Sequence, residues 1–378
     1  MTMIEGTVAP GFEPVRAAFA ANFERHSEVG AAVSVYLHGR KVVDLWGGTA
    51  DPQTDRAWHH DTLQAIYSAT KSATAACAHL LAQRGHLDLD APVADYWPEF
   101  SAAGKERIPV RWLLSHQAGL PALDRRMPLA DALAWEPMVA ALAAQTPEWE
   151  PGTAHGYHGL TYGWLVGEVV RRVSGRSLGA YFTQEIGDPL GLDFWIGLPK
   201  TEQHRVSRIV EPPSQAETLA LADPTSLIMR TMLITSEPLD LNDPDVQAAE
   251  VPAVNGICTA QSLARFYAAL IGEVDEVRIL DANTLATATA EQASGVDRVL
   301  GVPTRPALGF GLPLPDMPWY SSSAFGFPGL GGSLGYADPA TGIAFGYVMN
   351  RLHADMTPDH RAASLVQAMH ASLTQKSS

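Results

Sequence analysis

A serine and a lysine three positions apart, at the head of a run of small residues, constrain this chain more than any other feature. Ser68-Ala69-Thr70-Lys71 leads into a stretch rich in Ala and Leu that ends at Gly85. Alanine and leucine favour helix, and glycine suits the position after a helix C-terminus. Positions i and i+3 share one helix face, so the Ser68 hydroxyl and the Lys71 amine are expected to point the same way. The small side chains predict a helix packed closely on all sides.

This pair has a chemical meaning if the lysine is removed from water. A serine hydroxyl becomes a nucleophile only when a base takes its proton. A lysine amine is such a base where burial or nearby charge lowers its pKa. The helix start adds a field that favours negative charge near Ser68. The motif is short and recurs by accident, so an ordinary helix start with a solvated Lys71 stands as the alternative.

Composition bounds the class of protein. The chain has 378 residues, 46% of them hydrophobic, which is ample for one large domain or two interleaved ones. A net charge of −15 argues against nucleic acid or an anionic membrane as a main partner. Cys77 and Cys258 lie in apolar contexts and are predicted to be buried thiols. No secretory signal or membrane-spanning stretch is visible, so a cytoplasmic protein is expected.

Strand signals occur at both ends of the chain, with helical signals between them. The sequence predicts a helix over 12–27 and then a hairpin over 31–46, closed by Gly47-Gly48, so the sheet is expected to be at least partly antiparallel. A strand is predicted at 343–350, and Thr357-Pro358 is expected to begin a final helix. Further helices are predicted over 129–145, 162–173 and 260–272.

The segment from about 200 to 250 is rich in prolines and acidic residues, which predicts a long irregular excursion that covers a pocket. Its apolar residues either line an acyl-binding site or form core under a loop. They are Leu227, Ile228, Met229, Met232 and Leu233. Both interpretations fit the sequence.

Two later motifs complete a pattern that begins at Ser68. Tyr157-His158-Gly159 follows in the middle of the chain, and a glycine-rich stretch over 326–333 lies near the C-terminus. In this order the motifs resemble the serine β-lactamase and penicillin-binding superfamily, and look most like the family VIII carboxylesterases. Supporting segments lie at 43–48, 113–120, 151–153 and 336–339.

The resemblance implies an α+β fold of the β-lactamase/transpeptidase type, in which an antiparallel sheet flanked by helices carries an inserted all-helical domain. The sheet domain would comprise residues 1–72 and 251–378. The helical domain would comprise residues 73–250, including the cover segment over about 200–250. The active site is expected in the cleft between the two domains.

The same resemblance assigns roles to site residues. Ser68 is expected to be the acylated nucleophile, with Lys71 and Tyr157 as general base and acid. A nearby ammonium is expected to lower the pKa of the Tyr157 phenol, and a buried aromatic with a satisfied hydroxyl is the alternative for this residue. The oxyanion hole is assigned to the backbone N–H groups of Ser68 and Leu330. Other substrate-binding residues in the Leu330 segment are Phe327, Gly329 and Gly331.

Two departures from the family pattern bear on the substrate. Phe327 stands where the third motif often begins with lysine, histidine or tryptophan, and Gly159 stands where β-lactamases have asparagine. A penicillin needs a cation for its carboxylate and a polar side chain for its amide, so these departures favour esters. Arg230 and Arg351 are the basic residues that could restore lactam binding. Pro328 cannot donate a sheet hydrogen bond, which predicts an edge strand.

Two other patterns in the sequence point to different chemistry. Gly331 to Gly335 matches the Gly-x-Ser-x-Gly nucleophile elbow, which needs a strand, a turn and then a helix, but strand and turn are predicted after Ser333. His59-His60-Asp61, and His155 with His158, lack a third metal ligand at suitable spacing and are predicted to be surface histidines. The sequence predicts no metal and no cofactor.

The sequence therefore predicts a serine esterase that hydrolyses small, mainly hydrophobic carboxylic esters through an acyl-enzyme on Ser68. Three alternatives stay open: an acyltransferase on the same site, a β-lactamase or D-amino peptidase-like enzyme, and a non-catalytic penicillin-binding-like module. The presence of Ser68, Lys71 and Tyr157 together argues against the last. The expected partner is a small-molecule ester, while the natural ester and the oligomeric state are left open.

Overall fold

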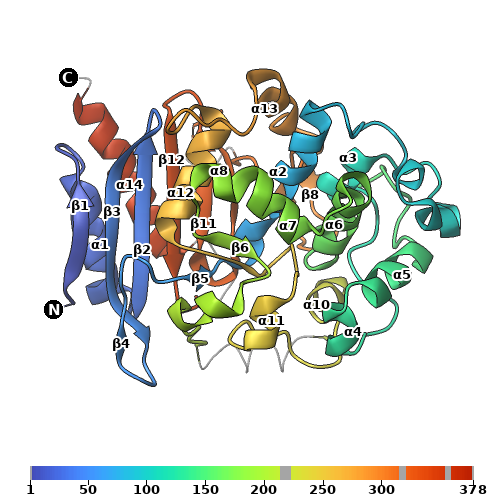
Figure 1. The fold of residues 1–378 in the computed structure, drawn as a ribbon, viewed down its shortest axis with the longest axis horizontal. Helices are drawn as coiled ribbons and strands as arrows, with labels where there is room; N and C mark the ends of the chain where they lie inside the picture. Colours follow the sequence, from blue (N-terminus) through green and yellow to red (C-terminus); the bar gives the residue numbers. More distant parts are fainter. Residues whose placement is uncertain (1, 213–222, 315–320, 354–358, 377–378) are drawn as a thin grey trace.

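An antiparallel sheet of seven strands, drawn from both ends of the chain, organises the protein (Figure 1). The structure is a computed structural model that describes residues 2–212, 223–314, 321–353 and 359–376. The strand order is β1-β3-β2-β12-β11-β10, with β4 beside β3. The strands are β1 (Ile4–Val8), β2 (Gly30–Leu37), β3 (Arg40–Asp51), β4 (Arg56–Ala57), β10 (Phe325–Pro328), β11 (Leu334–Asp338) and β12 (Ile343–Met349).

The predicted hairpin is present as β2 and β3, but its predicted end is wrong. Gly47 and Gly48 continue β3, because Gly47 pairs with Ala31 on one side and with Ile4 on the other. A Cβ on Gly48 would lie 2.1 Å from the carbonyl oxygen of Val29, so only glycine fits where β3 passes this close to the residue before β2. The strand that adds to this edge, β1, has only five residues, and the sequence did not predict it.

Helices cover both faces of this sheet. On one face α1 (Glu13–Arg25) packs against α14 (His360–Lys376), and on the other α12 (Ala260–Ile271) lies across β2, β11 and β12. Successive residues of a strand point to opposite faces. Val33 and Val35 therefore join the cluster under α1 and α14, while Ala32 and Tyr36 join the cluster under α12. The predicted start of the final helix, Thr357-Pro358, lies outside the described residues.

The inserted helices gather to the right of the sheet in Figure 1, away from both termini. At their centre α2 (Thr70–Gln83) packs against α6 (Thr161–Ser174). Every side chain over 70–81 is buried, which confirms the predicted close packing. α6 agrees with the helix predicted over 162–173 to within one residue at each end, and Gly175 caps it in the left-handed conformation.

The helix predicted over 129–145 is divided. It is replaced by α4 (Leu129–Leu133) and α5 (Glu136–Ala144), because Trp135 between them has a left-handed φ of 70°. The sequence could not predict this break, since alanine and leucine on both sides favour helix.

Short elements connect these parts. A three-stranded sheet is formed by β5 (Gln64–Ala65), β7 (Gly256–Cys258) and β6 (Phe194–Ile196), and β8 (Gly295–Val296) pairs with β9 (Pro303–Thr304). The short α-helices are α3 (Val110–Leu114), α7 (Leu178–Phe182), α8 (Asp188–Leu190), α10 (Leu227–Met232), α11 (Pro244–Ala248) and α13 (Ala282–Ala288). The 3-10 and π turns are η1 (Tyr67–Ala69), η2 (Val93–Asp95), η3 (Pro98–Gly104), η4 (Thr183–Gly187), η5 (Lys200–Arg205) and η6 (Leu330–Gly332).

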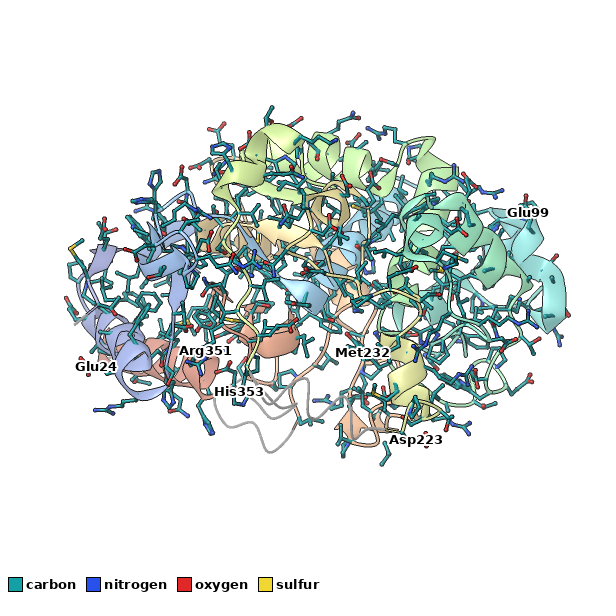
Figure 2. All side chains as sticks on the ribbon, turned by 90° about the horizontal axis from the view of Figure 1, so that it is seen from below. Glu24, Glu99, Asp223, Met232, Arg351 and His353 are labelled. Atoms are coloured by element: carbon teal, nitrogen blue, oxygen red, sulfur yellow. The ribbon has the colours of Figure 1, made fainter. Side chains whose placement is uncertain are left out.

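The described residues between 200 and 250 carry only the short helices η5, α10 and α11, in keeping with the predicted irregular excursion. Met229 is buried and the other four apolar residues named for this segment are half-buried. In Figure 2 Met232 marks α10 near the middle of the molecule.

The apolar core is continuous between the sheet and the helices. One hydrophobic cluster includes residues of β2, α12, α2, α5 and α6, and both Cys77 and Cys258 are buried free thiols as predicted. The division at residues 72/73 and 250/251 stays a prediction. Among the described helices, none combines the length and the apolar character that crossing a bilayer requires.

Candidate active site

Ser68 lies in a tightly held turn between β5 and α2. The amide of Ile66 donates to the carbonyl of Gly256 (2.9 Å), and Tyr67 has a left-handed φ of 48°. The hydroxyl of Thr70 donates to the carbonyl of Tyr67 (2.6 Å) and accepts from the amide of Gly256 (2.9 Å). A left-handed non-glycine residue persists only where its surroundings hold it. Ser68 is therefore presented by a fixed turn immediately before α2.

The structure brings together Ser68, Lys71 and Tyr157. The Ser68 Oγ and Tyr157 Oη atoms are 2.6 Å apart, and Lys71 Nζ lies 3.1 Å from the first and 2.9 Å from the second. Lys71 Nζ also donates to the carbonyls of Gly159 (2.8 Å) and Ala253 (3.1 Å). The side chain of Lys71 is fully buried, so the alternative of a solvated lysine is wrong.

The partners of Lys71 agree with a neutral amine. Burial lowers the pKa of Lys71 well below the ordinary value for lysine. A neutral amine has two N–H donors and one lone pair. The carbonyls of Gly159 and Ala253 can only accept hydrogen bonds, so they take the two N–H groups. The lone pair is then left to face the hydroxyls of Ser68 and Tyr157, where it can accept a proton.

Tyr157 does not have the lowered pKa that was predicted from the family resemblance. Burial raises the pKa of its phenol, the hydrogen bond with Ser68 opposes this rise, and the Asp297 carboxylate adds to it. The expectation is wrong because it assumed an ammonium at Lys71, whereas burial favours the neutral amine there. Tyr157 is therefore a neutral phenol in contact with a serine hydroxyl and an amine.

The third motif lies directly against the Ser68 turn. A Cβ on Gly329 would lie 2.1 Å from the carbonyl oxygen of Ile66, so this contact needs glycine. The buried Ser333 donates its hydroxyl to the same carbonyl (2.8 Å), and β11 begins at the next residue. No helix follows Ser333, so it does not lie in a nucleophile elbow. β10 ends the sheet with an exposed Pro328, as predicted for an edge strand.

Leu330 is half-buried at the start of η6, and the carbonyl of the next residue accepts two hydrogen bonds from the C-terminal part of the chain. Gly331 has a φ of 82°, and its carbonyl accepts from Arg361 Nη2 (2.9 Å) and from the amide of His353 (2.9 Å). Arg361 is itself buried and pairs with Glu28 at 2.9 Å. The turn that presents the Leu330 amide is therefore fixed by a buried ion pair.

The two positions that depart from the family pattern both border the lysine. The Phe327 ring stacks on Tyr157 with centroids 6.3 Å apart, and Lys71 Nζ lies 5.7 Å from the Phe327 centroid. A Cβ on Gly159 would lie 2.7 Å from the methyl group of Thr231 in α10. The space that an asparagine side chain would need is therefore filled by the 200–250 segment.

The predicted surface histidines divide into two groups. His59 and His60 are exposed as predicted, but His155 and His158 are buried. The prediction is wrong for this second pair because their spacing does not reveal the segments that cover them. His158 Nε2 accepts the amide of Leu120 (2.9 Å), and burial lowers its pKa to about 4. Within the described ranges, no group of three His, Cys, Asp or Glu residues is placed to hold a metal.

Sequence reasoning missed two residues that contact the Tyr157 segment, His116 and Asp297. Asp297 is buried and accepts the amide of Tyr157 (3.0 Å), while the His116 ring centroid lies 5.3 Å from that of Tyr157. His116 belongs to the 113–120 segment, which is one of the segments that resemble the family. That resemblance is the sequence signal that could have identified His116. Asp297 has no comparable signal in the sequence.

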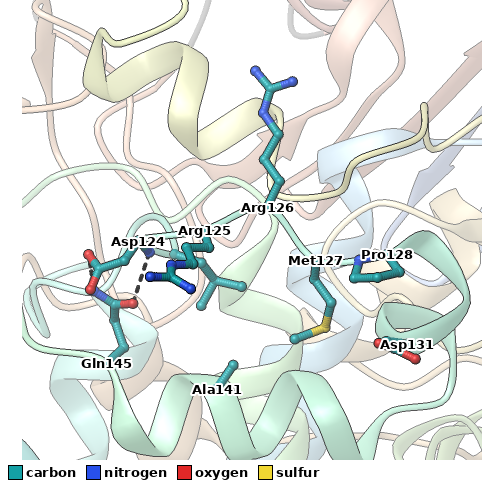
Figure 3. A pocket seen from close by; sticks show the side chains of 9 residues that line it. Asp124, Arg125, Arg126, Met127, Pro128, Asp131, Ala141 and Gln145 are labelled. Carbon is teal, nitrogen blue, oxygen red and sulfur yellow. Dashed lines mark hydrogen bonds between the residues drawn. The ribbon is translucent and has the colours of Figure 1, made fainter.

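A separate surface pocket of about 420 Å³ lies near α4 and α5 (Figure 3). Asp124 and Gln145, which hydrogen bond to each other, border it together with Arg125. None of the predicted site residues lines it. The hydrogen-bonded set at Ser68 is therefore the better candidate for an active site.

The fold and this set of side chains are those of serine hydrolases of the β-lactamase type. The family model described as Beta-lactamase matches residues 15–368. The chain therefore belongs to the β-lactamase family.

Individual relatives indicate more closely which kind of hydrolase this chain is similar to. Esterase/beta-lactamase LipL of Mycobacterium tuberculosis is 38% identical over 361 residues, which cover 92% of this chain and 83% of that protein. A crystal structure of a family VIII carboxylesterase is 40% identical with a TM-score of 0.88, covering 98% of this chain and all of the other. EstA from Arthrobacter nitroguajacolicus Rue61a is 34% identical with a TM-score of 0.89, covering 98% and 99%. The predicted family, fold and enzyme class, a serine hydrolase of the carboxylesterase and β-lactamase type, are confirmed.

Proposed function

We propose that this protein is a serine carboxylesterase that hydrolyses small, mainly hydrophobic esters through an acyl-enzyme on Ser68. The observation that carries the proposal is the hydrogen-bonded contact of Ser68 with a buried Lys71 and with Tyr157. A serine hydroxyl acts as a nucleophile when a neighbouring base takes its proton, and a neutral amine is such a base. The esterases among the relatives support the same reaction class.

In the acylation step, Ser68 Oγ attacks the ester carbonyl carbon and its proton passes to Lys71, directly or through the Tyr157 hydroxyl. The backbone N–H groups of Ser68 and Leu330 stabilise the developing oxyanion, which is usually a large part of such catalysis. Tyr157 then gives a proton to the departing alkoxide and recovers one from Lys71. Water attacks the acyl-enzyme with the same groups acting in reverse, which releases the acid and restores Ser68.

The surroundings of the site support an uncharged substrate. Phe327 offers an apolar surface beside Tyr157, and no side chain projects from Gly159 to bind an amide. A carboxylate-bearing lactam would lose a charge-assisted hydrogen bond at Phe327, worth about 1.5–3 kcal/mol. It would also lose a neutral amide hydrogen bond at Gly159, worth about 0.5–1.5 kcal/mol.

Both arginines considered for lactam binding have other partners. Arg230 pairs with Glu148 at 2.5 Å, and Arg351 donates to the carbonyl of Ser27 at 2.9 Å. In Figure 2 Arg351 lies on the sheet side of the molecule, away from Met232 and α10. These contacts support esters over penicillins as substrates.

The test compares kcat/KM for p-nitrophenyl butyrate with that for a chromogenic cephalosporin. The ester value should exceed the cephalosporin value by ~10-fold or more, since one lost charge-assisted hydrogen bond corresponds to about that factor. Intact mass after a short incubation should detect a butyryl group on the wild type and none on Ser68→Ala. A cephalosporin value equal to or above the ester value would replace the esterase with a lactamase.

A further inference from the structure

Three consecutive amides around Tyr157 are held by two residues from distant parts of the chain. The amide of Gly156 donates to the carbonyl of His116 (3.0 Å), and the amide of His158 donates to Nδ1 of the same histidine (3.1 Å). Between them, the amide of Tyr157 donates to Oδ1 of Asp297 (3.0 Å). The backbone on both sides of the tyrosine is therefore bound to His116, and its centre to Asp297.

The His116 ring can make its contact only when it is neutral. Its Nδ1 accepts the amide of His158, so the ring proton is on Nε2. The residue is 5% exposed, and burial lowers its pKa well below the ordinary range. Protonation would place an N–H against the N–H of His158 and break the hydrogen bond.

His116 holds this position despite two unfavourable features. Its φ is 62°, in the left-handed region that few non-glycine residues adopt. Its buried Nε2 has no hydrogen-bond partner within the described residues, and a buried donor without an acceptor is destabilising. The ring's one hydrogen bond goes to the residue after Tyr157, and the ring packs against Tyr157 at an interplanar angle of 56°. Strain of this kind concentrates at functional sites.

Asp297 ties a second loop to the tyrosine. Its side chain is 3% exposed, and Oδ1 accepts the amides of Tyr157, Val299 (2.8 Å) and Leu300 (2.8 Å). One carboxylate oxygen thereby closes the turn over 297–300 and fastens it to the Tyr157 backbone. Burial raises the pKa of the Tyr157 phenol and the Asp297 carboxylate adds to the rise, so the hydroxyl stays protonated.

We infer that His116 and Asp297 are positioning residues that hold the Tyr157 hydroxyl between Ser68 Oγ and Lys71 Nζ. The inference rests on the proposed function, in which this hydroxyl passes the proton. The hydroxyl lies 2.6 Å from Ser68 Oγ and 2.9 Å from Lys71 Nζ, so a small shift of the Tyr157 backbone would break both contacts. A displacement of about 1 Å in a catalytic arrangement can lower the rate by ~100-fold.

The test is a double-mutant cycle between His116 and Tyr157. His116→Gly removes the ring acceptor and tolerates the left-handed backbone, while the matched variant His116→Asn keeps a side-chain acceptor and tolerates it as well. With p-nitrophenyl butyrate, His116→Gly should lower kcat by ~10-fold or more with KM little changed, and His116→Asn should recover most of the loss. In a Tyr157→Phe background His116→Gly should change kcat by less than ~2-fold, because the hydroxyl that it positions is absent.

The cycle separates this inference from the proposed function. An equal fold-loss from His116→Gly in both backgrounds would overturn the inference and leave the role of Tyr157 intact. Wild-type activity in Tyr157→Phe alone would instead contradict the proposed function. If thermal melting shows that His116→Gly does not fold, Asp297→Ala and its matched variant Asp297→Asn take its place, with the same expected and contrary outcomes.

Discussion

Lys71 and Lys105 are both fully buried, and their surroundings differ in one chemical respect. Lys71 contacts two backbone carbonyls and the hydroxyls of Ser68 and Tyr157. Lys105 follows η3 and donates to three backbone carbonyls at 2.6 to 2.9 Å. These belong to Ala102, Ala143 and Gln145.

Burial lowers the pKa of both amines, that of Lys105 to about 8 and that of Lys71 well below its ordinary value. Three carbonyls match the three donors of an ammonium and have no proton to exchange, so Lys105 fastens the end of η3 to the end of α5. Lys71 faces two hydroxyls that can give up a proton. Burial alone does not make a lysine a catalytic base. The lysine also needs a neighbouring group from which it can take a proton.

The largest expected effect is at the serine that Lys71 contacts. Ser68→Ala should abolish hydrolysis of p-nitrophenyl butyrate and labelling by a fluorophosphonate, because the acyl group then has no acceptor. Ser333→Ala is the matched control. It loses a hydrogen bond to the Ile66 carbonyl but should still be labelled. Labelling of Ser68→Ala together with loss of labelling in Ser333→Ala would move the nucleophile to the other serine.

The next effect compares the two lysines directly. Lys71→Ala and Tyr157→Phe should each lower kcat by ~10²–10⁴, the usual size of a general-base contribution. Their double variant should be little worse than the worse single one, because residues that act as a unit are not additive. Lys105→Met should keep kcat near wild type while lowering the melting temperature, since it leaves buried carbonyls without a donor.

Two results would break this comparison. A loss of kcat in Lys105→Met as large as that in Lys71→Ala, at a temperature where both are folded, would mean that burial rather than the partners matters. A double variant whose loss equals the product of the two single losses would assign Lys71 and Tyr157 to independent steps.

The smallest expected effect concerns the dependence of kcat/KM on pH. Protonated Lys71 has no lone pair, so kcat/KM should fall as the pH drops through the pKa of this amine, which burial places well below the ordinary lysine range. The raised pKa of Tyr157 predicts no alkaline loss below the ordinary tyrosine range. A pH series for the wild type and Lys105→Met should give superimposable profiles. An acid limb with its midpoint near the ordinary lysine pKa of ~10.4 would mean that Lys71 is an ammonium at neutral pH.

Local patterns in the sequence predicted much of the fold. The helix predicted over 162–173, observed as α6, and the hairpin of β2 and β3 follow from propensity and alternation, which act over a few residues. The break at Trp135 and the extension of β3 through Gly47 did not follow, because both depend on contacts with distant segments. The burial of His155 and His158 was missed for the same reason.

The sequence by itself determined that Ser68 and Lys71 would lie on one side of a helix start, because a spacing of three residues sets that geometry whatever surrounds it. It also determined the family, since three motifs in order are specific where one is not. Only the tertiary structure decided which of the site groups are protonated. The carbonyls that take the N–H groups of Lys71 come from residues 88 and 182 positions away, and desolvation depends on every segment that closes over the site.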